Sequence, residues 1–268
     1  MVNGWRSYDD VAEVYERVHA PRTGMVATDL VTYAGVDPGE RVLDVGTGTG
    51  VATEAAAGVV EGHAGIAIGV DVSLPMLVTG RKVRPDLHFV GGEVIDLPFR
   101  DATFDVVTST FVLQHFTRYD TALFDMLRVT RSGGRVAAAT WGANIDDLER
   151  SWRSLLEERT GPDMLRDVQK QASPWRARFE DRELLEETFV DAGMRSVRTE
   201  RREYRFTFRL EEWIEGRAAL PTGRFVKQML GDQIFATFLD HVRSVFADRF
   251  SDPLNDFRDV WFAVGTKS

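Results

Sequence analysis

Three glycines at alternate positions follow a short apolar segment, and this arrangement constrains the fold more than any other feature of the chain. The segment Arg41-Val-Leu-Asp-Val reads as a buried strand, and Gly46, Gly48 and Gly50 then lead into a helix expected from Val51. Glycine has no Cβ, so the backbone can turn sharply and approach a ligand, while the helix N-terminus offers free N–H groups. The pattern predicts a unit of strand, loop and helix that holds a nucleotide-like cofactor.

The spacing of these glycines separates two classes of cofactor. A dinucleotide site has the pattern G-x-G-x-x-G, with the pyrophosphate on the helix N-terminus, whereas this chain has G-x-G-x-G followed by Val51. Asp44, at the end of the strand, is placed to hold a cation rather than a phosphate. S-adenosylmethionine has an ammonium group and no phosphate, so it fits this loop better.

The chain resembles the class I S-adenosylmethionine-dependent methyltransferases, in particular the small-molecule branch that includes the quinone-biosynthesis enzymes. One glycine motif alone has little specificity, whereas five motifs at family-like separations have much more. The resemblance covers roughly residues 8–142 well and the remainder only in outline. The matching segments are Val42-Leu-Asp-Val-Gly-Thr-Gly-Thr-Gly50, Ile68-Gly-Val-Asp-Val-Ser73, Gly92-Glu-Val-Ile-Asp-Leu-Pro-Phe99, Phe104-Asp-Val-Val-Thr-Ser-Thr-Phe-Val-Leu-Gln-His115 and Leu127-Arg-Val-Thr-Arg-Ser-Gly-Gly-Arg135.

Short apolar strands alternate with helices over the next hundred residues. Such strands form a parallel sheet that is covered on both faces and binds ligands at its carboxyl edge. We therefore expect an α/β, Rossmann-like doubly wound sheet, and the resemblance implies seven mostly parallel strands with an antiparallel last strand. Strands are expected near 41–46, 65–71, 87–91, 104–110 and 134–141, with helices starting near Val51, Pro75 and Tyr119.

Helical segments are expected on both sides of this core. Residues 8–34 read as helical, with Pro21 and Gly24 separating two apolar stripes, and the alternation of strands and helices stops at residue 143. The expected parts are N-terminal helices over the cofactor site (1–40), the cofactor-binding core (41–142), a helical lid (143–180) and the rest of the sheet (181–268). The last part is expected to contain a helix (182–192), two strands (195–208 and 258–266) and a second helical insertion (210–252).

Asp71 is the best cofactor candidate after the glycines. It lies 21 residues beyond Gly50 at the end of an apolar strand, where a carboxylate can accept both ribose hydroxyl protons. The alternative is a helix cap before Ser73. Val72 and Met76 would then flank the adenine, although either residue can equally belong to the core.

The remaining cofactor contacts are implied by the resemblance. Glu93 stands where the family usually has Asp or Asn, with the Val94 backbone at the adenine; the alternative for Glu93 is an exposed loop carboxylate. Thr110 matches a position at the methionine part of the cofactor, and Tyr15 matches a helix tyrosine that closes over it or else only packs. The full expected set is Tyr15, Asp44, Gly46, Thr47 (in place of a frequent cysteine), Gly48, Thr49 (also at the methionine part), Gly50, Asp71, Val72, Met76, Glu93, Val94, Thr110 and His115.

His115 is the catalytic candidate. It follows the fourth strand, where the family often has a histidine facing the cleft, and a neutral imidazole there can take a proton near neutral pH. The alternatives are cofactor binding and a helix cap. The other histidines have no motif context and are interpreted as surface or structural residues: His19, His63, His88 and His241.

Two further groups of side chains have both a functional and a structural interpretation. Seven aromatic residues can form a pocket for a planar or lipophilic substrate, or can simply belong to the core. The arginines between residues 195 and 209 can contact an acidic substrate, but alternation along a solvated strand explains them more simply. The aromatic residues are Trp5, Tyr8, Phe111, Trp141, Trp152, Trp175 and Trp213.

Composition excludes several classes of function. The net charge of −9, without a basic cluster, argues against nucleic acid as a partner. The absence of cysteine excludes disulfides, thiolate metal sites and the cysteine-held iron–sulfur cluster of radical chemistry, and no other ligand spacing indicates a metal. No apolar stretch is long enough for membrane insertion, so we expect a cytoplasmic protein, with a homodimer left open.

The expected function is methyl transfer from S-adenosylmethionine to oxygen or carbon, less so nitrogen, of a small hydrophobic or aromatic metabolite of the natural-product or quinone type. One alternative is a non-catalytic S-adenosylmethionine-binding regulatory or assembly protein, because binding and catalysis share the same residues. Another is a nicotinamide oxidoreductase, which the glycine spacing and the lack of a Tyr-x-x-x-Lys pair disfavour. A nucleic-acid methyltransferase is disfavoured by the absence of an Asn/Asp-Pro-Pro-Tyr/Phe motif.

Overall fold

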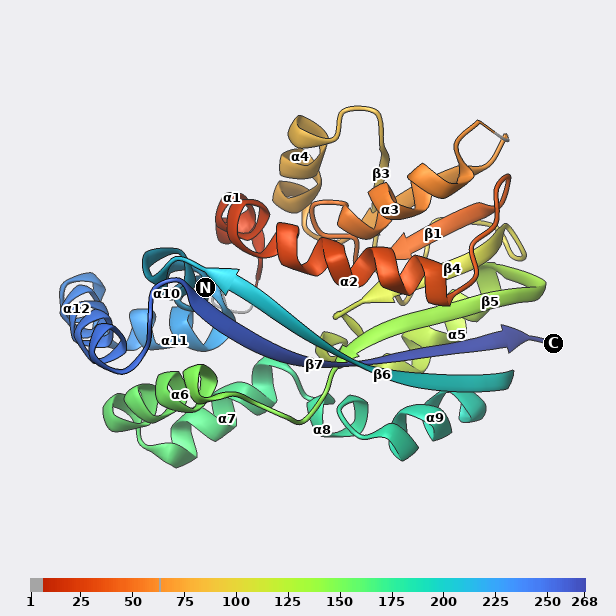
Figure 1. Ribbon diagram of the computed structural model, residues 1–268. Coiled ribbons are helices and arrows are strands. Elements are labelled where there is room, and N and C mark those ends of the chain that lie inside the picture. Colours follow the sequence, from red (N-terminus) through yellow and green to blue (C-terminus); the bar gives the residue numbers. More distant parts are fainter. Residues whose placement is uncertain (1–6, 63) are drawn as a thin grey trace.

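Seven strands form the sheet at the centre of the protein, in the order β3-β2-β1-β4-β5-β7-β6 (Figure 1). The computed structural model describes residues 7–62 and 64–268. Strands β1 to β5 are parallel, and β7 runs antiparallel to both β5 and β6. The expected doubly wound sheet with an antiparallel last strand is confirmed. The strands are β1 (Arg41–Val45), β2 (Ile66–Asp71), β3 (His88–Gly91), β4 (Phe104–Thr110), β5 (Thr130–Trp141), β6 (Met194–Phe208) and β7 (Leu254–Lys267).

Helices cover both faces of this sheet because its central strands are apolar on both sides. In β1, Val42 packs in the core shared with α2 and α3, whereas Leu43 packs in the core shared with α5 and α9. No helix among the described residues is long and apolar enough to cross a membrane. The helices are α1 (Ala12–Val14), α2 (Ala20–Tyr33), α3 (Val51–Val60), α4 (Leu74–Val83), α5 (Tyr119–Val129), α6 (Asp147–Thr160), α7 (Pro162–Ala172), α8 (Arg176–Phe179), α9 (Arg182–Asp191), α10 (Leu210–Ala219), α11 (Pro221–Leu230) and α12 (Asp232–Arg249).

The expected elements are present with three corrections to their limits, one of which is that β7 begins at Leu254, four residues before the expected start at 258. The helical separation predicted at Pro21 and Gly24 is wrong, because α2 runs through both residues. Pro21 lies in the first turn of α2, where a missing N–H leaves no helical hydrogen bond unmade, and a π-helical turn at Tyr15–His19 precedes it. Strand β5 begins at Thr130, four residues earlier than expected, because Thr130 pairs with Phe104 across a register shift.

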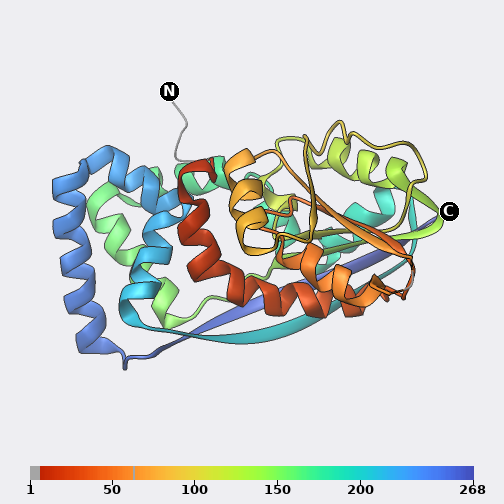
Figure 2. The same cartoon turned by 90° about the horizontal axis from the view of Figure 1, so that it is seen from above.

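The two helical insertions gather around an extension of the sheet. Strands β6 and β7 pair from Met194–Lys267 to Phe208–Leu254, whereas β5 pairs with β7 only as far as Val260. Residues 254–259 of β7 therefore continue beyond the carboxyl end of β5 in a two-stranded ribbon (Figure 1). Helices α10–α12 and α6–α7 lie at this end of the molecule, seen from above in Figure 2.

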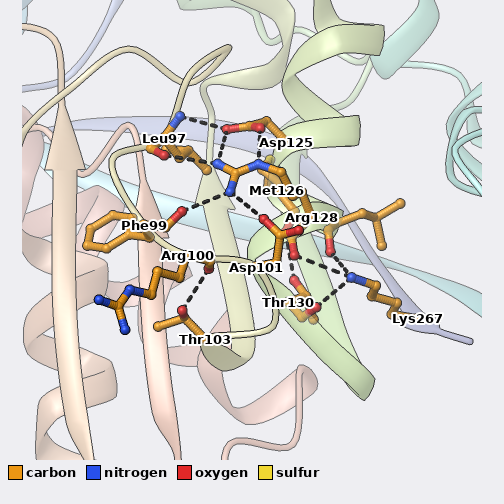
Figure 3. Close-up of polar contacts among 11 residues, drawn as sticks. Leu97, Phe99, Arg100, Asp101, Thr103, Asp125, Met126, Arg128, Thr130 and Lys267 are labelled. Atoms are coloured by element: carbon orange, nitrogen blue, oxygen red, sulfur yellow. Dashed lines mark hydrogen bonds and ion pairs between the residues drawn. The ribbon is translucent and has the colours of Figure 1, made fainter.

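The loop between β3 and β4 is held by a half-buried arginine on α5 (Figure 3). Arg128 donates from Nη2 to the Leu97 carbonyl at 2.9 Å and pairs through Nε with Asp125 at 2.6 Å. Asp125 in turn accepts the Leu97 N–H at 2.6 Å. Lys267 Nζ donates to carbonyls at the end of α5, where the helix dipole favours a cation. This network fixes the loop that carries Glu93.

Candidate active site

A cavity of about 1180 Å³ opens at the carboxyl edge of the sheet and continues beneath both helical insertions. Ligand sites usually enclose about 300 to 1,000 Å³, so this volume has room for a cofactor and a second molecule. The predicted edge residues Gly46, Asp71, Glu93 and Thr110 all line it. The ends of four strands therefore meet at one cavity, as a parallel sheet requires.

Asp44 lies buried at the floor of the cavity, with 1% of its surface exposed. Thr108 donates its hydroxyl to Oδ1 at 3.0 Å, and Thr53 donates to Oδ2 at 3.3 Å. Burial raises the pKa of the Asp44 carboxyl to about 6, although these hydroxyls favour the charged form. A cationic ligand group would restore the ionised form, so the site suits an ammonium.

Asp71 stands at the end of β2, facing the glycine loop. Its Oδ2 accepts the Gly48 N–H at 2.8 Å and its Oδ1 accepts the Ser73 N–H at 2.9 Å. Each carboxylate oxygen keeps a second lone pair for a ligand hydroxyl. The helix-cap role belongs to Ser73, whose Oγ accepts the Met76 N–H at the start of α4. Burial raises the pKa of Asp71.

Only some of the predicted cofactor residues in the glycine loop line the cavity. Gly48 has φ +57°, and a Cβ there would meet only the methyl carbon of Met76, at 3.3 Å. Gly50 has φ +101°, and its missing Cβ makes room for the Phe89 ring, 2.6 Å from where that atom would lie. Thr49 and Gly50 do not line the cavity, although Gly48 before them and Val51 after them do. The Thr49 hydroxyl is buried and has no hydrogen-bond partner among the described residues, and the cofactor contacts of Thr49 and Gly50 stay predictions.

The other predicted cofactor residues surround the same space. Val72 is 69% exposed at the rim, whereas Met76 is buried beneath it, so the two lie at different depths rather than in one layer. The Thr110 hydroxyl is buried and has no hydrogen-bond partner within the part of the chain that the structure describes, so it is available to a ligand. The remaining lining members of the set are Tyr15, Gly46, Thr47, Glu93, Val94 and His115.

The N-terminal segment closes one side of the cavity. The Tyr15 ring packs edge-on against Tyr8 at 5.9 Å, and Ser73 donates its hydroxyl to the Asp9 carboxylate at 2.5 Å. Burial raises the pKa of Tyr15 to about 12, so its hydroxyl stays protonated. Tyr15 therefore packs against a neighbouring ring and also lines the cavity.

His19 is a cavity residue that the sequence analysis interpreted as surface or structural. Its Nε2 lies 3.2 Å from the Gly216 carbonyl of α10, and its ring packs against Tyr15 at 5.4 Å. Burial lowers its pKa to about 4, so the imidazole is neutral. Its spacing of four residues from Tyr15, on one helical face, was the available signal. His88 and His241 are exposed, as expected, and His63 lies outside the described residues.

His115 is held in one tautomer. Its Nδ1 lies 2.7 Å from the carbonyl oxygen of Ala172 at the end of α7. A carbonyl only accepts, so Nδ1 carries the proton of the neutral ring and Nε2 keeps a lone pair. The Gln114 amide nitrogen lies 3.2 Å from Nε2 and donates to it. Burial lowers the pKa of His115, so the neutral form prevails near pH 7.

Aromatic side chains form a wall at the ends of β4 and β5. The rings of Phe111 and Trp141 stack with centroids 3.7 Å apart and planes 6° from parallel. Phe111 has φ +61°, an uncommon conformation for a bulky residue that concentrates at functional sites. Tyr8, Trp175 and Trp213 also line the cavity. The pocket interpretation is wrong for Trp152, which is buried in the core, and Trp5 lies outside the described residues.

The arginines of β6 follow the structural interpretation. Arg198 donates to the Tyr33 carbonyl at 2.8 Å, and Arg202 pairs with Glu200 at 2.6 Å. Arg201 pairs with Asp259 at 2.5 Å. None of the three arginines lines the cavity.

A buried ionic cluster at the insertion end of the cavity was missed. Glu149 lies between Arg153 and Arg217, each 2.7 Å away, and Arg258 pairs with Asp256 at 2.9 Å. Burial opposes ionisation of Glu149, but the arginines hold its pKa below the ordinary value, whereas burial raises the pKa of Asp256 to about 7. These residues come from α6, α10 and β7, so no local spacing in the sequence announces them.

Comparison with known proteins finds a family match in the cofactor-binding core, before the first helical insertion. The family described as "Methyltransferase domain" matches residues 43–138. The demethylmenaquinone methyltransferase of Renibacterium salmoninarum is 39% identical over 137 residues, which cover 49% of this chain and 56% of that protein. The chain thus spans little more than half the length of this relative.

A longer match and a solved structure extend the likeness. The ubiquinone/menaquinone biosynthesis C-methyltransferase UbiE of Vibrio parahaemolyticus is 32% identical over 177 residues, covering 62% of this chain and 68% of that protein. Phosphoethanolamine N-methyltransferase 2 of Haemonchus contortus, solved with S-adenosylhomocysteine, superposes with a TM-score of 0.59 at 17% identity. That alignment covers 100% of this chain and 61% of the other and shows a shared fold.

Proposed function

The chain belongs to the class I S-adenosylmethionine-dependent methyltransferases, and we propose that it transfers a methyl group to an oxygen or carbon atom of a small aromatic metabolite. One observation carries this proposal. A single cavity joins the acidic sheet edge at Asp44 and Asp71 to the stacked Phe111 and Trp141 rings and to His115. Cofactor side, acceptor side and a candidate base therefore share one enclosed space.

The residues at the sheet edge fit the cofactor. Asp71 would accept the ribose hydroxyl protons, Asp44 would hold the ammonium, and the Thr110 hydroxyl would meet the methionine part. Gly48 leaves backbone open to the ligand, because only a flexible methionine methyl lies near its missing Cβ. When bound, S-adenosylmethionine supplies a methyl group on a positively charged sulfur, which is an activated leaving group.

His115 would act on the acceptor as a general base. Its Nε2 lone pair can take the proton of an acceptor hydroxyl, while the Ala172 carbonyl keeps the other ring proton on Nδ1. An acceptor hydroxyl would replace the Gln114 amide as the donor to Nε2. The low pKa of the buried ring keeps the base in its reactive form at neutral pH. An aromatic acceptor would lie in the cavity that the stacked pair and this imidazole share.

Turnover separates this function from that of a non-catalytic cofactor-binding protein. The purified protein is incubated with methyl-tritiated S-adenosylmethionine and a panel of phenols, hydroquinones and their carboxylated derivatives. Label that enters an extracted aromatic product supports methyl transfer, and the position of the new methyl group by mass spectrometry and NMR assigns oxygen or carbon. Binding of S-adenosylhomocysteine without labelled product from any acceptor would favour the regulatory or assembly role.

A further inference from the structure

The ionic cluster at the insertion end of the cavity has no part in the methyl transfer described above. Its members are Glu149, Arg153, Arg217, Asp256 and Arg258, and all five line the cavity. The carboxylates of Glu149 and Asp256 are buried and the three arginines are partly buried, and ion pairs within the cluster compensate these charges only in part. The cluster therefore needs a functional account as well as its role in tying α6 and α10 to β7.

The charges within this cluster do not balance. Three guanidinium groups share the carboxylates of Glu149 and Asp256, with longer contacts of 3.6 Å from Arg258 to Glu149 and 3.8 Å from Arg217 to Asp256. Burial favours the neutral form of Asp256, which adds to the positive excess near neutral pH. A single negative charge from a ligand would neutralise the group.

Neighbouring charged groups are already committed elsewhere. The Asp146 carboxylate accepts the backbone N–H groups of Glu149 and Phe257, each at 2.8 Å, as the cap of α6. Arg176 pairs with Glu180 at 3.0 Å, and Asp259 pairs with Arg201. Asp146 keeps its negative charge and acts on Asp256, but it does not line the cavity; on the cavity wall itself the three guanidinium groups of the cluster stand with two carboxylates.

Donors remain free on the two innermost arginines. The ion pairs of Arg217 and Arg258 use Nη2 in each case, so the Nη1 group of each guanidinium is left to donate to a ligand carboxylate, one oxygen to each arginine. Arg217 also lies 4.9 Å from the Trp213 ring centroid, which fixes its plane. Its side chain is only 13% exposed.

The two ends of the cavity carry opposite charge. Acidic residues Asp9, Asp44, Asp71 and Glu93 line the cofactor end, whereas arginines predominate at the insertion end. A cationic cofactor and an anionic acceptor would therefore each lie against the opposite charge. This division orients an acceptor with its anionic group away from the sulfonium.

We propose that the guanidinium groups of Arg217 and Arg258 bind a carboxylate of the methyl acceptor, which is then an aromatic carboxylic acid. This inference rests on the proposed function. Trp141 is the register partner of Val260, which lies two residues from Arg258 along β7, so Trp141 and Arg258 are diagonal neighbours on one face and their backbones lie roughly 7–8 Å apart. That separation matches a benzoate-sized acceptor, with its ring at the stacked aromatic pair and its carboxylate at Arg258.

Fluorine NMR with 4-fluorobenzoate and the isosteric 4-fluorobenzamide tests the assignment without knowledge of the natural substrate. Both probes are titrated against protein saturated with S-adenosylhomocysteine. The acid is expected to bind at least tenfold tighter than the amide. Equal binding of the two probes, binding of neither up to 10 mM, or tighter binding of 4-fluorophenyl phosphate would each overturn the carboxylate assignment.

Variants locate the effect. Arg258→Gln is expected to remove the tenfold preference for the acid, and Arg258→Lys to restore part of it. Arg202→Gln, which removes an arginine of β6 outside the cavity, is expected to leave the preference unchanged. A preference that survives in Arg258→Gln and Arg217→Gln would place the anion site elsewhere.

Titration of S-adenosylhomocysteine separates this inference from the proposed function. A protein that fails to bind it has lost the basis of the methyltransferase proposal, whatever the fluorinated probes do. A protein that binds it but shows no preference for the acid retains the proposed function and loses the carboxylate site. The same titration shows that each variant is folded.

Discussion

The Asp71 carboxylate accepts a hydrogen bond from the backbone N–H of Gly48 at 2.8 Å. This contact joins the end of β2 to the loop that follows β1, and a second bond from Ser73 joins it to the start of α4. Three elements of the cofactor end are thus held by one side chain. The ribose candidate and the glycine loop form a single preformed unit.

Asp71→Asn tests this unit. The amide keeps the size of the carboxylate but cannot accept with both groups, so the affinity for S-adenosylhomocysteine should fall by about tenfold or more, the loss expected when a charged hydrogen-bond acceptor is removed. Calorimetric titration measures it. Asp191→Asn, at an exposed position at the end of α9, is the matched control and should bind as the wild type does. An affinity unchanged in Asp71→Asn would contradict the ribose assignment.

Two glycine variants should fail for different reasons. In Gly50→Ala the new methyl carbon would lie 2.6 Å from the Phe89 ring at φ +101°, so the free energy of unfolding should fall by about 2 kcal/mol or more. In Gly48→Ala the methyl group enters the cavity, so stability should fall by only about 1 kcal/mol while S-adenosylhomocysteine binding weakens. Urea unfolding and calorimetry separate the two outcomes. Equal losses of unfolding free energy in the two variants, or equal losses of S-adenosylhomocysteine affinity, would contradict the separate roles of Gly48 and Gly50.

Cofactor affinity should depend on pH through Asp44. Its pKa is raised to about 6 in the free protein, so the carboxyl is protonated below that pH and ionised above it. A ligand ammonium favours the ionised form, so binding of S-adenosylhomocysteine should tighten by about tenfold from pH 5 to pH 7 and level off above that. Calorimetry across this range provides the measurement. Asp44→Asn should show weaker binding without this slope.

His19 should make the free energy of unfolding depend on pH between about 4 and 6.5. Its folded pKa of about 4 lies below the ordinary 6.5, so between these values the unfolded chain binds the proton and the folded protein does not. Its contribution is therefore intact above pH 6.5 and is lost as the pH falls toward 4, by about 3 kcal/mol in all. His19→Gln should flatten this part of the urea-unfolding profile, whereas the exposed His241→Gln should not.

His115→Gln should separate binding from chemistry. Removing the base should lower kcat about a hundredfold or more with an acceptor that the panel identifies, while S-adenosylhomocysteine binds within a factor of about three. In the wild type, kcat/KM should stay level as the pH falls to 6.5 and decline only below it, because burial lowers the pKa of the imidazole. A variant with full kcat would leave His115 a positioning role only.

The cofactor end could be predicted because its residues follow strand ends at fixed local spacings. Asp44, Gly48 and Asp71 each stand just after or at the end of an apolar strand, and a parallel sheet brings such ends together. The same reasoning predicted cofactor contacts for Thr49 and Gly50, which do not line the cavity, and those contacts stay predictions. Glycine was required at position 50 for packing against Phe89, a contact visible only in three dimensions.

The acceptor end could not be predicted in the same way. Glu149, Arg217 and Arg258 lie on two insertion helices and the last strand, separated by 68 and 41 residues, and tertiary packing alone pairs them. Alternation along β6 correctly predicted that its arginines lie on a solvated strand and not on the cavity, since periodicity reports which face a side chain occupies. It could not report that other arginines, on different elements, converge on a buried carboxylate.

Calorimetric titration of the wild-type protein with S-adenosylhomocysteine, run beside NADH, tests the central claim most directly. We predict micromolar binding of S-adenosylhomocysteine at one site per chain and no heat from NADH, because the glycine loop lacks the dinucleotide spacing and its floor is acidic. Binding of NADH, or no binding of S-adenosylhomocysteine at millimolar concentration, would contradict the account of the cavity as a methyltransferase cofactor site.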